Sequence, residues 1–372
     1  MRYAMIMAGG AGTRLWPMSR KNRPKQLLPF IHDPRPGAPP ASLLALAAAR
    51  LEGVVPPERR FICTGESYRD AIRAALPEFS DARILGEPVA RDTVNAVGFA
   101  AAVFEKLDPG AIFAVFTADH VIAPLDVFRQ RVDLGFRLVE ADPRRLVTFS
   151  IEPTYPATGY GYVERGTPVL GLSGSENLAY RVARFVEKPN AQRAQAYFES
   201  GLFGWNSGMF VWKAATVLDC LRRFKPECHA GLMEIQRAWG TPAQAETLGR
   251  VYPTLPRTSI DYAVMEPAGA DKQVQVCTVR MDVEWLDVGS WPSYGETLPA
   301  DADGNRLGGV GRAVTMGTRG SLVAVDNPGH TVALLGVENL IVIHTPDATL
   351  IMPREKAESL KALHDALDER LK

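Results

Sequence analysis

Short apolar runs alternate with longer amphipathic stretches over most of the chain. The runs at 3–8, 61–64 and 111–116 predict buried strands, and the stretches at 42–51 and 92–106 have the apolar spacing of helices. Strands that alternate with helices indicate a mostly parallel sheet that is covered on both faces. Ligands bind such a sheet at the carboxyl ends of its strands, so we look for chemistry there.

The pattern changes after residue 298, where 299–305 is a polar linker rich in turn residues. Beyond the linker, short apolar runs separated by turn residues predict a small β-domain; they lie at 322–325, 331–335, 340–344 and 349–352. Leucines at spacings of three and four over 354–371 predict one amphipathic helix that docks on its own domain. We therefore expect two domains, 1–297 and 298–372.

Composition narrows the class of protein. The 372 residues contain 42 Lys+Arg and 42 Asp+Glu, whereas proteins of nucleic acids or membrane surfaces normally show a basic excess. No apolar run approaches the ~20 residues of a membrane span, and the apolar start gives way to glycines and basic residues, the reverse of a cleavable leader. The four cysteines contain no Cys-x-x-Cys pair. We expect reduced thiols, a cytoplasmic protein, and neither a nucleic acid nor a membrane as partner.

The most informative stretch follows the first predicted strand. Gly9, Gly10 and Gly12 precede five cations, and no acid occurs before Asp33; the cations are Arg14, Arg20, Lys21, Arg23 and Lys25. Glycines at a strand end let backbone N–H groups turn toward an anion, and a triphosphate would supply the counter-charges that the cations need. The alternative is a flexible turn beside a solvated basic strip. No G-K-[ST] ending of a P-loop is present, and Leu15 replaces the last glycine of the dinucleotide fingerprint, which disfavours a nicotinamide dehydrogenase.

Two acids are candidate metal ligands beside the basic loop. Asp119 follows the strand at 111–116, and Asp287 lies between Trp285 and Trp291. Alone, each acid is more often a cap or turn residue, but together with the basic loop they suit Mg²⁺, which prefers one or two carboxylates plus phosphate and water.

A second group of polar residues suits a sugar phosphate. Glu187 and Lys188 end an apolar stretch, and Asn206 lies in an otherwise apolar one. Acid and amide groups match sugar hydroxyls, and lysine matches a monophosphate, although an exposed ion pair and a turn are equally compatible with this spacing. The glycines at 159 and 161 indicate a hairpin or a close backbone approach to a ligand. Spacing alone assigns no role to Glu87.

These motifs together resemble the mannose-1-phosphate guanylyltransferases, within the nucleotide-diphospho-sugar pyrophosphorylase family. The matching segments extend along the whole chain: 5–10, 24–26, 118–120, 158–162, 185–189, 205–209, 259–263 and 285–291. The resemblance implies a Rossmann-like α/β nucleotidyltransferase domain with a mixed, mostly parallel sheet. It also implies a small left-handed β-helix-like domain with a terminal helix, and a single activity without an appended isomerase domain.

The resemblance further implies a reaction in which GTP and mannose 1-phosphate give GDP-mannose and pyrophosphate with Mg²⁺. The implied catalytic residues are Arg14, Lys25, Asp119 and Asp287, of which the two acids hold the metal. The implied nucleotide-binding residues are Gly9, Gly10, Gly12, Thr13, Arg14, Glu87 and Thr93. The implied sugar-phosphate residues are Gly161, Glu187, Lys188, Asn206 and Asp261. A homodimer is compatible with this assignment.

One departure bears on the choice of base. The family usually has Arg-Asn-Thr-Ala-Pro-Ala near the base pocket, whereas this chain has Arg91-Asp92-Thr93-Val94-Asn95-Ala96. Two alternatives therefore stay open: the same chemistry on another nucleotide or sugar 1-phosphate, and a nucleotide-sugar sensor without turnover. The retained lysine and acids argue against the sensor.

Overall fold

The computed structural model describes residues 1–10, 12–31 and 40–372, and the chain forms two compact units, each built from separate stretches. Unit 1 comprises Met1–Gly9, Ala48–Thr117 and Ile122–Trp285, and unit 2 comprises Gly10–Ala47, Ala118–Val121 and Leu286–Lys372. Gly10, Gly12 and both expected metal ligands thus belong to the same unit as the β-domain. The domain boundary between residues 297 and 298 stays a prediction.

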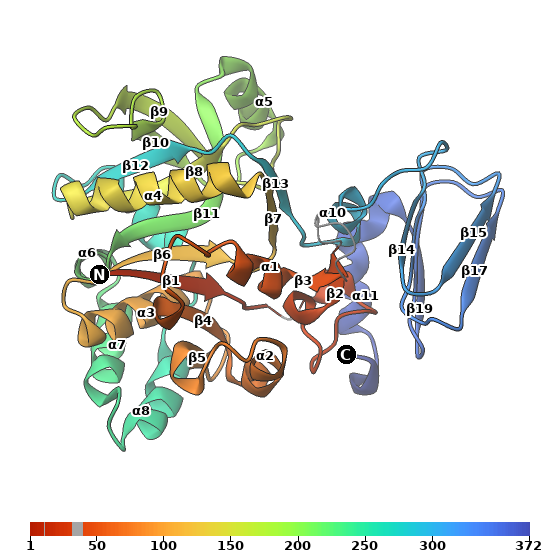
Figure 1. Cartoon of the computed structure of the whole chain (residues 1–372), viewed down its shortest axis with the longest axis horizontal. Coiled ribbons are helices and arrows are strands. Elements are labelled where there is room, and N and C mark those ends of the chain that lie inside the picture. Colours follow the sequence, from red (N-terminus) through yellow and green to blue (C-terminus); the bar gives the residue numbers. More distant parts are fainter. Residues whose placement is uncertain (11, 32–39) are drawn as a thin grey trace. The chain divides into compact units, whose positions relative to one another are not determined.

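Unit 1 contains a nine-stranded mixed sheet (Figure 1). The strands β5, β4, β1 and β6 lie side by side in parallel, and β8 pairs with β12 in parallel. Strand β11 runs antiparallel to β6, β8 and β9, and β10 runs antiparallel to β12 and β9. The strand bounds are β1 Arg2–Met7, β4 Arg60–Gly65, β5 Ile84–Glu87, β6 Ile112–Thr117, β8 Arg145–Ile151, β9 Tyr162–Pro168, β10 Ala179–Val186, β11 Phe203–Lys213 and β12 Gln275–Arg280.

Helices cover both faces of this sheet, because alternate residues of the central strands are apolar on both sides. In β6, Phe113 packs edge-on against Phe104 of α3, while Phe116 lies against Phe128 of α4 on the opposite face. The core on the α3 side also contains residues of α6, α7 and α8. The helix bounds are α2 Arg69–Ala75, α3 Thr93–Leu107, α4 Leu125–Ala141, α5 Ala191–Ser200, α6 Ala214–Phe224, α7 Pro226–Ala238, α8 Gln244–Val251 and α9 Glu266–Ala268.

Unit 2 contains a coil of short parallel strands. β14 (Arg306–Gly309), β16 (Leu322–Val325) and β18 (Leu340–His344) form one parallel layer, which β19 (Thr349–Pro353) extends in the antiparallel sense. β15 (Arg312–Met316) and β17 (Thr331–Leu335) form a second parallel layer. Aliphatic side chains from both layers fill the interior: Val323, Val325 and Val342, with Ala313, Val332 and Leu334. The expected β-helix-like domain is therefore present.

The other face of the first layer packs on a second core of unit 2. This core joins the basic loop to the β-domain, since it contains Leu15 and Trp16 together with Trp291, Ile341 and Leu360. The short elements around it are β2 Pro29–Ile31, β3 Ala41–Ser42, α1 Leu43–Ala49 and α10 Trp291–Glu296, and β7 (His120–Ala123) pairs with β13 (Glu284–Asp287).

The predicted single helix over 354–371 is wrong. The segment forms a 3-10 helix (Arg354–Ser359), a short α11 (Leu360–Asp365) and a second 3-10 turn (Glu369–Leu371). Asp368 is extended and its side chain accepts a hydrogen bond from the Arg370 N–H, so it starts a new turn and does not continue the helix. No helix in the described part of the chain is long and apolar enough to cross a membrane.

Candidate active site

The glycine-rich loop in unit 2 has a backbone that only glycine fits at Gly12. Its φ is +67°, and an ideal Cβ there would lie 2.7 Å from the Cβ of Lys25. The Gly12 carbonyl accepts a hydrogen bond from Ser19 Oγ at 2.6 Å, and the Gly10 carbonyl accepts one from Gln26 Nε2 at 3.4 Å. Gly10 also has a positive φ and, like Gly9, open space beside its α-carbon. The loop carbonyls are therefore held by neighbouring side chains.

The side chain of Lys25 reaches the expected metal ligands. Lys25 is buried, and its Nζ lies 2.7 Å from Asp119 Oδ2. Burial acts to raise the pKa of Asp119, but the Lys25 ammonium and the His120 ring together lower it below its usual range. Asp119 is thus held as a carboxylate.

Asp287 lies beside Asp119. One potential ligand atom each from Asp119, His120 and Asp287 lies within 4.8 Å of the others. Burial and the negative charge of Asp119 raise the pKa of Asp287. Sequence reasoning assigned no role to His120, although it directly follows Asp119.

Arg14 lies near Asp287. The ideal Cβ of Gly289 would lie 3.4 Å from Asp287 Oδ1 and 3.5 Å from Arg14 Nη2, so both groups flank this glycine. The Arg14 side chain is half exposed and pairs loosely with Glu358 at 3.5 Å. Its guanidinium is therefore accessible to a ligand next to the acids.

The acid cluster suits a divalent cation. Two carboxylates close enough to disfavour each other's charge are stabilised by a cation between them, and carboxylate oxygen is a preferred ligand of hard cations. Divalent metals serve the reactions of nucleotidyl transferases in general, where they neutralise phosphate charge. Asp119 and Asp287 are the residues present to hold one.

A separate polar cluster lies in unit 1 and contains the predicted sugar-phosphate residues. The Asn206 amide is fixed at both ends: its Oδ1 accepts from Thr148 Oγ1 at 2.9 Å, and its Nδ2 donates to Asp261 Oδ1 at 2.8 Å. Burial, and next the charge of Glu187, raises the pKa of Asp261 to about 6. Asp261 opens a π-helical turn (Asp261–Met265), a rare element that is frequent at functional sites.

Gly161, Glu187 and Lys188 belong to the same cluster. An ideal Cβ on Gly161 would lie 2.5 Å from Glu187 Oε2, so this carboxyl occupies the space that glycine leaves. Burial raises the pKa of Glu187, while Lys188 Nζ lies 3.6 Å from its Oε1. The Lys188 backbone has φ +44°, a strained value for a non-glycine residue, and its side chain is largely exposed.

Glu87 and Thr93 are also in unit 1, each with a partner that the sequence did not reveal. Glu87 is buried and accepts a hydrogen bond from Tyr252 Oη at 2.6 Å, and burial raises its pKa. Thr93 Oγ1 accepts from the N–H of Ile260 at 2.9 Å, next to Asp261. Tyr252 and Thr148 were missed because each lies far from its partner in sequence and in no motif.

The departure at Asn95 has a structural explanation. Its side chain is fully buried, and Nδ2 donates to the carbonyls of Arg91 and Pro256 at 2.8 and 2.7 Å. Asn95 therefore fixes the start of α3 at the position where the family usually has proline.

The expectation that a triphosphate balances all five cations of the loop needs correction. Carboxylates of unit 2 pair with every one of them: Arg14 with Glu358, Arg20 with Asp347, Lys21 with Glu369, Arg23 with Asp326, and Lys25 with Asp119. Sequence could not show this, because four of these five acids lie more than three hundred residues further along the chain.

Residues 3–304 match the family described as Nucleotidyl transferase, and residues 311–367 match the family described as MannoseP isomerase/GMP-like beta-helix domain. Fold, glycine-rich loop and acid cluster thus define a nucleotidyl transferase.

Individual relatives narrow the class. The chain is 36% identical to mannose-1-phosphate guanylyltransferases of Klebsiella pneumoniae and Escherichia coli, over 97% of this chain and 73% of each relative. A solved structure from Thermus thermophilus, described as a mannose-1-phosphate geranyltransferase, matches with a TM-score of 0.82 and 32% identity over 98% of both chains. The chain belongs to the mannose-1-phosphate guanylyltransferases of the nucleotidyl transferase family.

Proposed function

We propose that this protein transfers GMP from GTP to mannose 1-phosphate, giving GDP-mannose and pyrophosphate. The observation that carries the proposal is the cluster of Lys25, Asp119 and Asp287 in a chain that aligns over 97% of its length with enzymes named for this activity. A sugar phosphate oxygen attacks the α-phosphorus, and pyrophosphate leaves in line. Such transfer depends mainly on positioning and charge neutralisation.

We propose the roles that the family resemblance implies. The half-exposed Arg14 and the buried Lys25 flank the two acids, so they bind the phosphates and stabilise the charge of the transition state. Backbone N–H groups of Gly9, Gly10, Gly12 and Thr13 face the nucleotide. Glu87 and Thr93 contribute on the nucleotide side, and the cluster of Gly161, Glu187, Lys188, Asn206 and Asp261 binds the sugar phosphate.

We propose Mg²⁺ as the metal, held by Asp119 and Asp287. When bound, it neutralises phosphate charge. In Asp287→Asn, loss of one ligand should abolish turnover and also remove the rise in thermal unfolding temperature that Mg²⁺ gives the metal-free parent protein. The same rise in parent and variant would contradict this assignment without reference to activity.

A pyrophosphate-release assay over a grid of nucleoside triphosphates and sugar 1-phosphates tests the reaction itself. We expect the highest kcat/KM for GTP with mannose 1-phosphate, and the loss of that signal in Lys25→Ala. A higher value for another pair would change the substrates, and no turnover with any pair would favour a sensor.

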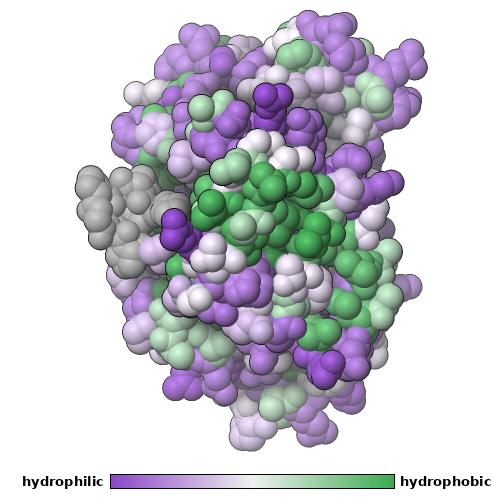
Figure 2. Space-filling view, turned by 90° about the vertical axis from the view of Figure 1, so that its right-hand side faces the viewer, coloured by the Kyte–Doolittle hydropathy of each residue, from purple (hydrophilic) through white to green (hydrophobic). Residues whose placement is uncertain are grey.

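We further propose that the protein is a cytoplasmic homodimer, in which a second copy covers the outer face of β15 and β17. Reduced, buried thiols suit a reducing compartment. Figure 2 shows apolar side chains gathered on this side of the β-domain. Met316 and Leu335 are register partners there and are 70% and 75% exposed. An open sheet face is normally polar, so an apolar one indicates a partner.

Charge supports a second copy as this partner. Arg312 begins β15 and Glu338 lies beyond the other end of β17, and neither has an ion pair within the residues that the structure describes. In a dimer with a two-fold axis perpendicular to this apolar face, the two copies of the face run in opposite directions. Arg312 of one copy then comes toward Glu338 of the other.

Light scattering after size exclusion tests the dimer. We expect twice 40.6 kDa for the parent and 40.6 kDa for Leu335→Lys, whereas Leu170→Lys, at a residue that is 80% exposed in unit 1, should leave the dimer intact. A monomeric parent, or a dimeric Leu335→Lys, would contradict the proposal.

A further inference from the structure

The basic loop, residues 12–25, has little regular structure of its own. It contains the 3-10 turn Thr13–Leu15, a tight turn closed by a bridge between Arg20 and Arg23, and at its end the start of the 3-10 turn Lys25–Leu27. The backbone hydrogen bonds within the loop close only tight turns, so holding the whole segment in one conformation requires contacts from outside.

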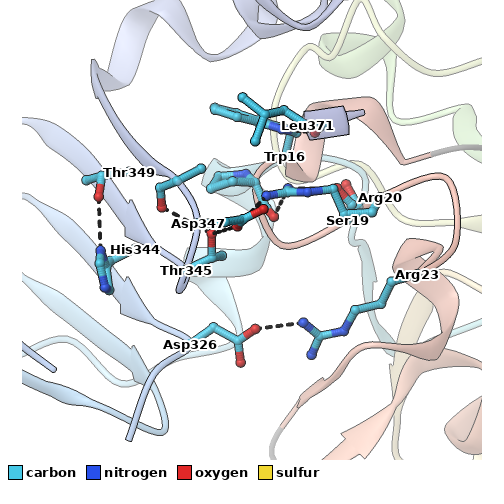
Figure 3. A network of polar contacts seen from close by, with 12 residues as sticks. Trp16, Ser19, Arg20, Arg23, Asp326, His344, Thr345, Asp347, Thr349 and Leu371 are labelled. Carbon is cyan, nitrogen blue, oxygen red and sulfur yellow. Dashed lines mark hydrogen bonds and ion pairs between the residues drawn. The ribbon is translucent and has the colours of Figure 1, made fainter. Parts of the chain in front are cut away.

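Ion pairs from the β-domain provide such contacts. Arg20 Nη2 lies 2.9 Å from Asp347 Oδ1, and Arg23 Nη1 lies 2.7 Å from Asp326 Oδ2 (Figure 3). Asp326 directly follows β16, and Asp347 lies in the turn between β18 and β19. Two separate turns of the β-domain therefore contact the loop.

The contact through Arg20 is more than an exposed ion pair. Only 13% of its side chain is exposed, and the guanidinium also donates to the carbonyls of Pro17 and Ser19. Thr345 Oγ1 donates to the same Asp347 oxygen at 2.9 Å, which fixes the acid (Figure 3). A guanidinium shared between a carboxylate and loop carbonyls fixes the loop backbone, because its donors have a rigid planar geometry.

Residues at the far end of the sequence add backbone contacts. Trp16 Nε1 donates to the Leu371 carbonyl at 2.8 Å, and the Lys21 N–H donates to the Lys372 carbonyl at 2.6 Å. Trp291 Nε1 in turn donates to the Trp16 carbonyl at 2.9 Å. The middle of the loop is thus held from several sides, between the two residues, Arg14 and Lys25, that reach the acids.

We infer that the β-domain and the segment 354–372 position the basic loop, with Asp347 and Asp326 as positioning residues that act through Arg20 and Arg23. Arg20, Lys21 and Arg23 then serve as anchors of the loop, and Arg14 and Lys25 remain the phosphate-binding cations. This inference rests on the proposed function in one respect, namely that the loop binds the nucleotide phosphates.

The double variant Asp347→Asn/Asp326→Asn tests the inference, because asparagine keeps the side-chain shape and removes the charge. Hydrogen exchange of the amides in residues 12–25, measured without substrates, should speed up at least tenfold. In turnover, kcat should fall by about ten- to a hundredfold, with a smaller change in KM for the sugar phosphate, since misplacement of reacting groups acts on the transition state. Asp347→Asn alone, with one anchor left, serves if the double variant does not fold.

Two controls separate positioning from a general loss of stability. Glu234→Gln removes an ion pair with Arg250 in unit 1 and should leave both readouts unchanged. The charge swap Arg23→Asp/Asp326→Arg should restore much of the kcat that Asp326→Arg loses, because the more exposed Arg23 guanidinium pairs with Asp326 alone among the described contacts. Exchange and kcat that stay at parent values in the double variant would overturn the inference.

The two readouts also distinguish this inference from the proposed reaction. Faster loop exchange in a protein that turns over no substrate pair would leave the positioning inference standing and contradict the reaction. If the parent makes GDP-mannose and the double variant keeps the exchange rates and kcat of the parent, the proposed reaction stands and the positioning inference is contradicted.

Discussion

At the scale of single residues, Gly161 defines the shape of the polar cluster that we propose to bind the sugar phosphate. Alanine fits its backbone, but the new Cβ would lie 2.5 Å from Glu187 Oε2 and would displace that carboxyl. We expect Gly161→Ala to raise KM for mannose 1-phosphate roughly tenfold, because binding groups that move by a fraction of an ångström lose contact with their ligand. Steady-state kinetics measure this change. Gly159→Ala is the control, since nothing lies within 4 Å of its ideal Cβ; equal effects of both would contradict the argument.

Asp261 gives a prediction for pH dependence. Its pKa is raised to about 6 by burial and by Glu187, so the folded protein holds this proton more tightly than the unfolded chain does. Stability conferred by the protonated form is therefore lost as the pH rises from about 4 through 6.

Asp261→Asn should stabilise the protein above pH 6 by about 1–3 kcal/mol relative to the parent, and by little near pH 4, because one pKa unit corresponds to about 1.4 kcal/mol. Urea unfolding at pH 4.5 and 7.5 measures the difference. Asp70→Asn, at a side chain that is 95% exposed, should show no such pH dependence. A constant difference for Asp261→Asn at both pH values would refute the prediction.

Sequence reasoning reached part of the site at this scale. The sequence predicts that Lys25, Asp119 and Asp287 act together, because each lies in a motif at the end of an element. The structure brings the three side chains into one cluster. Partners outside motifs, such as Thr148 and Tyr252, could not be foreseen, because only the fold brings them to Asn206 and Glu87.

At the scale of elements, the start of α3 depends on Asp92. Its side chain accepts a hydrogen bond from the Thr93 N–H, and its backbone has φ +66°. Asp92→Ala loses the cap and puts a Cβ-bearing residue without a polar side chain in this conformation, at a cost of about 1–2 kcal/mol.

Asp92→Gly separates these two effects. Glycine also lacks the cap but adopts positive φ without strain, so its unfolding free energy should stay within about 0.5 kcal/mol of the parent. Chemical denaturation of both variants decides this, and equal losses would show that the backbone conformation contributes nothing.

Most strands and helices were foreseeable because their apolar spacing is local. The predicted strands at 322–325, 331–335 and 340–344 match β16, β17 and β18. The prediction of one helix over 354–371 was wrong because the spacing of leucines takes no account of Asp368, whose side chain begins a new turn.

At the scale of the whole molecule, the four cysteines report on global unfolding. Each is buried, and burial raises the pKa of every thiol, to about 12 for Cys220 and Cys277. Because the thiolate is the reactive form, we expect negligible labelling by Ellman's reagent in the native protein and four equivalents in urea. Rapid labelling of the native protein would show that one of these sites opens locally.

The division into two units was beyond the reach of sequence patterns. The sequence shows a change of composition at residue 298. It does not show that Leu15 and Trp16 pack with Trp291 and Leu360, because the identity of an apolar residue does not indicate which other apolar residues it contacts.

That discontinuous core also sets an order of events during synthesis. The basic loop leaves the ribosome more than three hundred residues before its anchors at 326, 347 and 369–372. Domains generally fold as units as they emerge, but unit 2 has to wait for its last strands. The nascent protein therefore carries the basic loop through the synthesis of more than three hundred further residues without the contacts that we propose to position it.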